Sequence, residues 1–550
     1  MKPSTWVSFS GLLALDKLPP SKAAPNCPLI GAEFPPPQRL SEHQTWKKAL
    51  KNITEVFEYI DTSNITGIDK FSYSIQIFST NPGAPILWER HRTAKDLPEN
   101  TTGVKEVDGN TVYRLGSVSK VFTVLAFLAE AGDVHWNQPV TKFIPELEKH
   151  VGRATAEDFD GVKETAWDDI TLGALASQVS GLGRDCETFV LQFFKGLDII
   201  YPSYPPWQTA TYSNIGYQLL AYALESISGK RFSDILNDRI IKPLGLNRTY
   251  YSDAPPSVGI VYGTIKDTYW NVSLGDANPG GNIYSSANDL STLGRAIISS
   301  KIIKPSLTRR WLNPVTFSSD LLASIGAPWG VRRIQLDKAN SPHRTLTVFT
   351  KAGTFRKYTA FITLLKDFNL GFTIMMANPA LNNFLGADLL GNSLIPAYNA
   401  VARSEADSLY SGTYMSIDGK SELTISTDRY KPGLGVGPWI SNGTDMVEMA
   451  FRMQAGSTVK PLNAETRLYY TQLESKTSRG KRQAWKAVFE DTGGPPAGQQ
   501  LFSTDCGSWV GITGVTYGAL PLDEFIFNLD HSGKVVSVEN LALRKKLYKK

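Results

Sequence analysis

The segment YRLGSVSKVFTVLAFLAEAG, residues 113–132, places a serine and a lysine three residues apart at the start of a long apolar run. From Val118 to Ala131, apolar residues cover nearly every face of a helix. The segment therefore predicts a buried helix that is too short to span a membrane, ended by Gly132. Ser117 and Lys120 then lie at its first turn, where both side chains can reach the same point.

The lysine in this segment is out of place for a purely structural helix. A cation in the first turn of a buried helix opposes the helix dipole and is costly to desolvate, and such a misfit indicates function. The Ser-x-x-Lys pattern alone is common, and the chain carries two more copies in polar surroundings, STVK from Ser457 and SRGK from Ser478. A chance pairing at a core boundary is therefore the alternative interpretation, and other motifs have to decide.

A base for a serine nucleophile is available in a second motif, TYSNIGYQLL, which starts a predicted amphipathic helix. A serine hydroxyl is a poor nucleophile unless a neighbouring base takes its proton. Tyr212 could act as a tyrosinate if nearby cations lower its pKa, and Lys120 could act if it were neutral. Asn214 follows Tyr212 by two residues.

A third motif, FTKAGTFRKYTAFITLL, lies between two predicted strands. Its glycine, Gly353, lets a ligand approach the backbone closely. The N–H groups of Thr354 and Ser117 could then bind the oxyanion that forms during acyl transfer. Lys351 supplies a second cation.

The order Ser-x-x-Lys, Tyr-x-Asn, Lys-x-Gly resembles the penicillin-recognising serine enzymes. The match is nearest to the branch of class C β-lactamases, D-alanyl-D-alanine peptidases and esterases, and indicates a fungal β-lactamase-related protein. It covers roughly residues 50–400 and includes ITLGALASQVSGLG, IIKPLGLNRTYYS and GGNIYSSANDLSTLGRAI. Two departures stand out: the third motif is Lys-Ala-Gly, and Gln178 replaces a histidine common in this family.

The resemblance implies catalytic roles for three residues. Ser117 would be the acylated nucleophile, and Lys120 would hold it and help to deprotonate it. Tyr212 would be the general base in acylation, kept partly ionised by Lys120 and Lys351, and then the general acid for the leaving group. No histidine lies in the three motifs, so a histidine-dependent mechanism has no candidate.

The resemblance also implies a substrate-binding set, formed by Asn214, Lys351, Gly353 and Thr354. Asn214 would hydrogen-bond the acyl side of the substrate. The expected partner is a small acyl substrate, with no cofactor. No metal is expected, because the six histidines and three cysteines are dispersed along the chain, and no nucleic acid, because the net charge of +5 is small for 550 residues. The oligomeric state stays open.

Three functions remain open at this point. The first is a serine hydrolase that cleaves a lactam, amide or ester through an acyl-enzyme. The second is an acyltransferase of the same fold, as in some relatives from fungal secondary metabolism. The third is a binding protein that keeps the fold without turnover. An α/β-hydrolase is excluded because the chain has no Gly-x-Ser-x-Gly elbow.

The fold class expected is α+β, an antiparallel sheet flanked by helices, followed by a C-terminal antiparallel β domain, either a barrel or a sandwich. We expect a leader and Pro-rich arm over residues 1–45, a catalytic domain over 46–405 and the β domain over 406–550. Strands from both ends of the catalytic domain should complete one sheet. No helical period of useful length appears between residue 407 and the tail, and LRKKLYKK at the end should be a solvated tail rather than a nucleic-acid site. The helices predicted in the catalytic domain are 41–59, 118–131, 170–178, 216–228 and 232–241. The predicted strands are 71–80, 86–94, 344–350, 358–365 and 371–378.

The N-terminus and the cysteines bear on localisation. WVSFSGLLAL resembles a short signal sequence, with small residues for cleavage near Ala24. Six N-x-Ser/Thr sequons favour the secretory route, with a cytoplasmic protein as the alternative. If Cys27 survives cleavage, it could pair with Cys506 and leave Cys186 as a free thiol.

Overall fold

The computed structural model describes residues 25–185, 193–456, 460–493 and 506–550, which form two compact units. The sheet unit comprises residues 36–334 and 346–401. The barrel unit comprises residues 25–35 and 335–345, and the described residues from Ala402 onward. Cys186 and the predicted leader lie outside the described residues. The predicted boundary at residue 405 lies inside helix α12 (Asn383–Tyr410).

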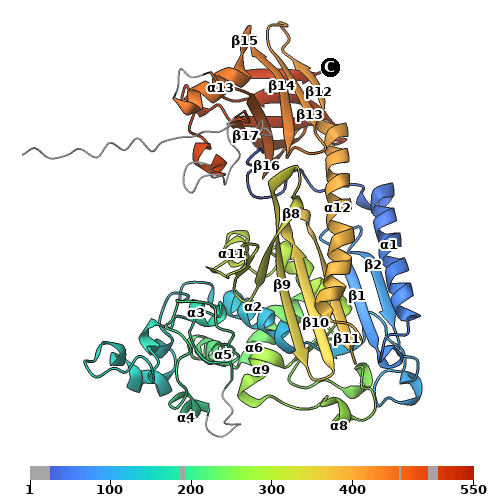
Figure 1. Ribbon diagram of the computed structural model, residues 1–550, viewed down its shortest axis with the longest axis vertical. Coiled ribbons are helices and arrows are strands. Elements are labelled where there is room, and N and C mark those ends of the chain that lie inside the picture. Colours follow the sequence, from blue (N-terminus) through green and yellow to red (C-terminus); the bar gives the residue numbers. More distant parts are fainter. Residues whose placement is uncertain (1–24, 186–192, 457–459, 494–505) are drawn as a thin grey trace, which may run out of the picture. The chain divides into compact units, whose positions relative to one another are not determined.

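The core of the sheet unit is an eight-stranded antiparallel sheet in the order β2-β1-β11-β10-β9-β8-β7-β6. Figure 1 shows β1 beside β11, although about three hundred residues separate them in the chain. Strands from both ends of this unit therefore complete one sheet, as predicted. The strands are β1 (Ser72–Ser79), β2 (Ile86–Arg92), β6 (Thr316–Phe317), β7 (Ala323–Ile325), β8 (Gly330–Asp337), β9 (Ser341–Phe355), β10 (Tyr358–Leu365) and β11 (Leu370–Ala377).

Helices cover both faces of this sheet, which is why every residue of β1 is buried. On one face, Gln76 accepts a hydrogen bond from Ser291 of α10 (Ala287–Ile298) at 2.8 Å. On the other face, the ring of Tyr73 packs against Phe57 of α1 (Gln44–Asp61). Helix α12 packs against the same sheet through stacked and edge-on aromatic pairs from β10 and the turn that follows it. The α+β fold class is confirmed.

The predicted helix around Lys120 is present as α2 (Ser119–Ala131), and it contacts α5 (Ile215–Ser228). Its first ten residues are all buried, which agrees with the continuous apolar run. The predicted helices at 170–178 and 232–241 are shorter α-helices in the structure. These are α3 (Leu172–Ala176) and α6 (Phe232–Leu236), the second continued by a π turn.

The main sheet in the described part of the barrel unit has nine antiparallel strands in the order β13-β12-β22-β21-β20-β17-β16-β14-β15. An additional pairing of β13 with β14 closes eight of them into a barrel, which confirms the predicted C-terminal β domain. The strands are β12 (Gly412–Met415), β13 (Glu422–Thr427), β14 (Leu434–Ser441), β15 (Thr444–Asp445), β16 (Ala464–Thr477), β17 (Gly480–Asp491), β20 (Glu524–Leu529), β21 (Val535–Asn540) and β22 (Lys545–Lys549).

Two expectations for this region are wrong. A helix does follow residue 407: α13 (Met446–Ala455) is capped by the Asp445 carboxylate and ends at Gly456 in a left-handed conformation. It buries only Met446 and Ala450, so its apolar period is too weak to read from the sequence. The basic tail is strand β22, in which Leu547 is buried while Lys546 and Tyr548, on the opposite face of the strand, are exposed.

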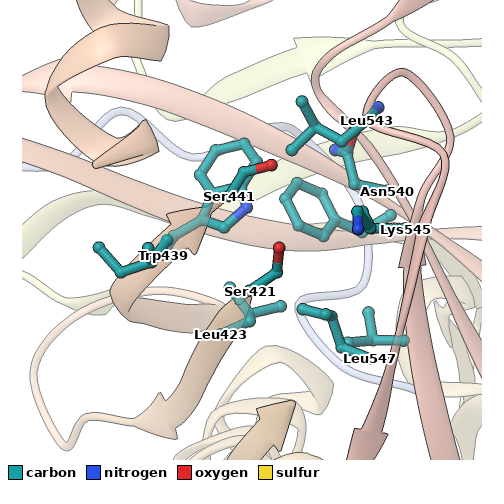
Figure 2. Close-up of a pocket in the computed structure, with 11 residues that line it drawn as sticks. Ser421, Leu423, Trp439, Ser441, Asn540, Leu543, Lys545 and Leu547 are labelled. Atoms are coloured by element: carbon teal, nitrogen blue, oxygen red, sulfur yellow. The ribbon is translucent and has the colours of Figure 1, made fainter. Parts of the chain in front are cut away.

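The barrel interior holds a small pocket lined mainly by apolar side chains such as Leu423, Trp439 and Leu547 (Figure 2). Two serines and Lys545 supply polar groups. Its cavity volume of about 10 Å³ accommodates about one water molecule.

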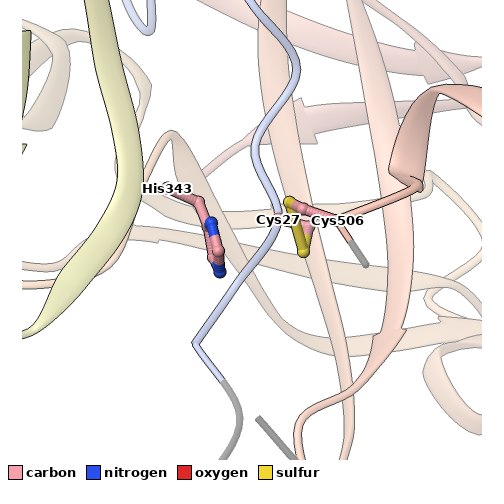
Figure 3. A group of neighbouring side chains, drawn as sticks. All are labelled: Cys27, His343 and Cys506. Carbon is pink, nitrogen blue, oxygen red and sulfur yellow. A yellow bond between two sulfur atoms is a disulfide. The ribbon is translucent and has the colours of Figure 1, made fainter. Parts of the chain in front are cut away.

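The N-terminal arm is fixed to the barrel by the disulfide Cys27–Cys506, which confirms the expected pairing. The ring of His343 lies beside it (Figure 3), and the potential ligand atoms of the three residues lie within 4.8 Å of one another. Because both sulfur atoms are joined in the disulfide, they offer no thiolate to a metal ion in this form.

Candidate active site

Two glycines bring the turn at Ser117 into contact with strand β9. Gly116 has φ +52°, and a Cβ there would lie 2.6 Å from the backbone nitrogen of Thr354. A Cβ on Gly353 would overlap the carbonyl oxygen of Leu115 and lie 2.7 Å from the backbone nitrogen of Ser117. Any side chain at either position would force the two segments apart. The backbone nitrogens of Ser117 and Thr354 therefore lie on neighbouring backbone segments, as a pair of oxyanion donors requires.

The hydroxyl of Ser117 lies between two side chains from the other predicted motifs. The Tyr212 hydroxyl donates a hydrogen bond to Ser117 Oγ at 2.7 Å. Lys120 Nζ lies 3.3 Å from the same oxygen. A potential nucleophile, a phenol and an amine thus converge from the turn before α2, from α2 itself and from the loop before α5.

Lys120 is completely buried, and its amine lies among uncharged oxygens. Nζ donates to Asn214 Oδ1 and to the carbonyl oxygen of Gly280, each at 2.6 Å. Burial first, and then the nearby charge of Lys351, hold the pKa of Lys120 well below its usual value. A neutral amine has two N–H groups and one lone pair. With both N–H groups donated to these acceptors, the lone pair remains for the Ser117 hydroxyl.

The phenol of Tyr212 differs from expectation. Three basic side chains lie near its ring: Lys120 Nζ at 5.1 Å, Lys351 Nζ at 5.4 Å and the Arg184 guanidinium carbon at 4.8 Å from the centroid. Burial nevertheless raises the pKa of Tyr212, against the smaller lowering effects of the Ser117 hydrogen bond and Arg184. The expected partly ionised tyrosine is therefore wrong, because desolvation outweighs the cations.

Lys351 is buried at the same place, with Nζ donating to the carbonyl oxygen of Ala352 at 2.8 Å. Burial, followed by the charge of Arg184, lowers the pKa of Lys351 to about 8. It is thus mostly charged at neutral pH. A second cation next to Tyr212 gives this side of the site a net positive charge.

Four residues in the site carried no predicted role. Gln178 adopts φ +64° and accepts a hydrogen bond from the backbone N–H of Ser213 at 2.5 Å, so it shapes the loop that carries Tyr212. Gly280 provides the carbonyl for Lys120, and it lies in the GGNIYSS stretch singled out by resemblance. Arg184 and Asp185 follow the SGLG stretch, and only their adjacency to that motif could have indicated them.

The decoy motifs lie elsewhere in the fold. Ser478 is exposed in the turn between β16 and β17, and Ser457 lies outside the described residues. Tyr269 of the second Tyr-x-Asn is partly exposed, while Trp270 beside it is buried. The structure thus gathers all seven predicted site residues, Ser117, Lys120, Tyr212, Asn214, Lys351, Gly353 and Thr354, around one hydroxyl.

Comparisons with known proteins point to one family. A family model described as "Beta-lactamase" matches residues 91–389, and one described as "Beta-lactamase-like-like, C-terminal domain" matches residues 402–550. A "Beta-lactamase-like protein" of Arthroderma benhamiae is 27% identical, over 96% of this chain and 97% of its own length. "Probable hydrolase clz13" of Cochliobolus lunatus is 24% identical, over 88% and 87%.

Among solved structures, an octameric penicillin-binding protein homologue from Pyrococcus abyssi is 14% identical. It covers 91% of this chain and 99% of its own, with a TM-score of 0.47. The first family model alone matches more than half of the chain. The chain belongs to the beta-lactamase family.

Proposed function

We propose that this protein is a serine hydrolase that cleaves a small amide, lactam or ester through an acyl-enzyme on Ser117. The observation that carries the proposal is the position of Ser117 Oγ, which accepts from the Tyr212 hydroxyl at 2.7 Å with Lys120 Nζ at 3.3 Å. The neighbouring backbone nitrogens of Ser117 and Thr354 support an oxyanion site for the tetrahedral intermediate.

The proton transfers follow from the pKa directions. The neutral Lys120 amine takes the proton of Ser117 as Oγ attacks the carbonyl carbon. The protonated Tyr212 gives its proton to the departing nitrogen or oxygen, and Lys120 returns a proton to Tyr212. Water then attacks the acyl-enzyme by the reverse steps. Tyr212 thus acts as proton donor and shuttle, and Lys120 takes the role of base.

An acyltransferase is the second candidate, since the same acyl-enzyme can be resolved by an alcohol or amine. The two functions share every residue named above and differ only in the acceptor. The names of two relatives, "Probable hydrolase clz13" and "Unguisins hydrolase ungD'", favour water as the acceptor. A binding protein without turnover is the third candidate, and the intact Ser117, Lys120 and Tyr212 cluster argues against it.

The test is intact-protein mass after incubation with a panel of β-lactams and p-nitrophenyl esters. The wild type should gain one acyl group and lose it with time in water. Ser117→Ala should gain none, and Ser478→Ala should behave as the wild type. Acylation that survives Ser117→Ala would overturn the proposal. A stable acyl-enzyme that decays only on addition of an alcohol or amine would favour the acyltransferase.

We also propose that the chain folds in the secretory pathway. Its disulfide Cys27–Cys506 is typical of an oxidising compartment. The asparagines of all six sequons are exposed, and they are Asn52, Asn64, Asn100, Asn247, Asn271 and Asn442. Expression of the full chain in a fungal host should yield glycosylated protein in the medium, seen as a mass loss on enzymatic deglycosylation. Unglycosylated protein with free thiols in the cytosol would contradict this.

A further inference from the structure

The side-chain amide of Asn214 is held from both ends. Its Oδ1 accepts a hydrogen bond from Lys120 Nζ at 2.6 Å, and its Nδ2 donates one to Asp185 Oδ1, also at 2.6 Å. The backbone N–H of Asn214 donates to the carbonyl oxygen of Arg184 at 2.8 Å. The dipeptide Arg184-Asp185 therefore fixes both the main chain and the side chain of Asn214.

The chemistry of the two ends determines which way the amide points. An ionised carboxylate only accepts hydrogen bonds, and an amide oxygen cannot donate to it. Turning the Asn214 amide over would place its oxygen against the Asp185 carboxylate and its NH₂ group against the N–H groups of Lys120. Both contacts would be lost together. The Asp185 carboxylate thus specifies the orientation in which Oδ1 faces the amine.

We infer that Asp185 is a positioning residue, which holds the Asn214 amide so that Lys120 Nζ stays directed at Ser117 Oγ. Asp185 makes no described contact with Ser117 and acts through Asn214. The inference rests on the proposed function, because it concerns the residue that we assign as the base. In this orientation the Asn214 amide donates one N–H to Asp185, so its second N–H is available to a substrate carbonyl.

The charge of Asp185 has a second, separable effect. Its proximity raises the pKa of Lys120, against the larger lowering by burial and by Lys351. Removing the carboxylate should therefore lower the pKa of Lys120 further. The charged and titratable groups around this amine come from β9, the loop after α3 and the start of α5, and they are Lys351, Arg184, Asp185, Tyr212 and Tyr217.

Two variants separate position from charge. Asp185→Asn keeps an oxygen that accepts from Asn214 Nδ2 but removes the charge, and Asp185→Ala removes both. Asp69→Asn is a charge-matched control, at an exposed position outside the site. The measurement is the rate of acylation against pH, with the β-lactam or ester that acylates the wild type. Because the Asp185 side chain is about half exposed, both variants should fold normally, which melting temperature checks.

We expect Asp185→Ala to lower the maximal acylation rate about tenfold, the size of effect typical of a hydrogen bond to a charged group. Asp185→Asn should keep the maximal rate within about threefold. Both should move the acidic limb of the profile to lower pH, because the neutral amine then persists to lower pH. An Asp185→Ala enzyme with the maximal rate and the acidic limb of the wild type would overturn the inference. Failure of the wild type to acylate would instead reject the proposed function.

Discussion

Buried basic side chains lie in both units of the molecule, but their hydrogen-bond partners differ. In the barrel unit, the buried Arg344 donates two hydrogen bonds to Glu33, at 2.6 and 2.7 Å. In the sheet unit, the hydrogen bonds that Lys120 and Lys351 donate, to Asn214 Oδ1 and to two backbone carbonyl oxygens, go to uncharged acceptors. Carboxylate pairing keeps an arginine charged, whereas burial without it lowers the pKa of a lysine. The ion pair of Arg344 with Glu33 stabilises the fold, whereas the lowered pKa of Lys120 suits it to act as a base.

The largest effect that this comparison predicts is the loss of acylation rate in the variant Lys120→Met. Loss of a general base typically lowers a rate by about 10²–10⁴-fold, so acylation should fall by that factor. Stability should change little, because two opposing effects nearly cancel. The buried amine no longer has to be desolvated, but Asn214 and Gly280 lose a donor. Stopped-flow acylation and a thermal melt measure the two quantities. A variant that no longer folds would make this lysine a structural residue.

The matching variant in the barrel unit is Arg344→Met, which leaves the Glu33 carboxylate buried without its two hydrogen bonds. Breaking a buried pair in this way costs about 3–5 kcal/mol, so the melting transition of the barrel should move to markedly lower temperature. Differential scanning calorimetry follows it, with Lys120→Met as the comparison. Equal stability losses in the two variants would remove the distinction between the two kinds of buried cation.

A smaller effect concerns Lys351, whose pKa burial lowers to about 8. The preference of the enzyme for anionic over neutral substrates should depend on pH. The folded pKa lies below the usual value, so the amine is charged below pH 8 and loses its charge as the pH rises through it. Attraction for a carboxylate-bearing substrate is then present at pH 7 and lost at pH 9. The ratio of kcat/KM for an anionic ester to that for its neutral analogue should fall several-fold between these values. Lys351→Gln should give a low ratio that does not change with pH.

The sequence predicted the parts of the site that carry reacting groups. The serine, lysine and tyrosine motifs each stand at the start of an apolar helix or between strands, so their spacing and context could be read directly. That strands from both ends of the unit complete one sheet was also predictable, because strong β patterns lie at these ends, whereas β6, β7 and β8 were not predicted. Strand β22 could not be recognised from the sequence, because its lysines outnumber its single buried leucine.

What the sequence could not predict is the balance of opposing energies within the site. Three nearby basic side chains suggest an ionised Tyr212, and only the extent of burial shows that desolvation raises the pKa of this phenol nevertheless. Asp185 was missed for a different reason. It is an ordinary exposed carboxylate in the sequence, and its role depends on a contact with Asn214, which is twenty-nine residues further along the chain.

The close fit of Gly353 against the turn at Ser117 has a consequence for how the protein matures. During synthesis, the turn with Ser117 leaves the ribosome long before strand β9, and the strands on either side of β11 are made about three hundred residues apart. Such long-range pairing is slow to form. The nascent chain therefore carries its serine and lysine without an oxyanion site, and it is chemically inert until the central sheet is complete. The appearance of acylation during refolding would report the docking of β9 directly.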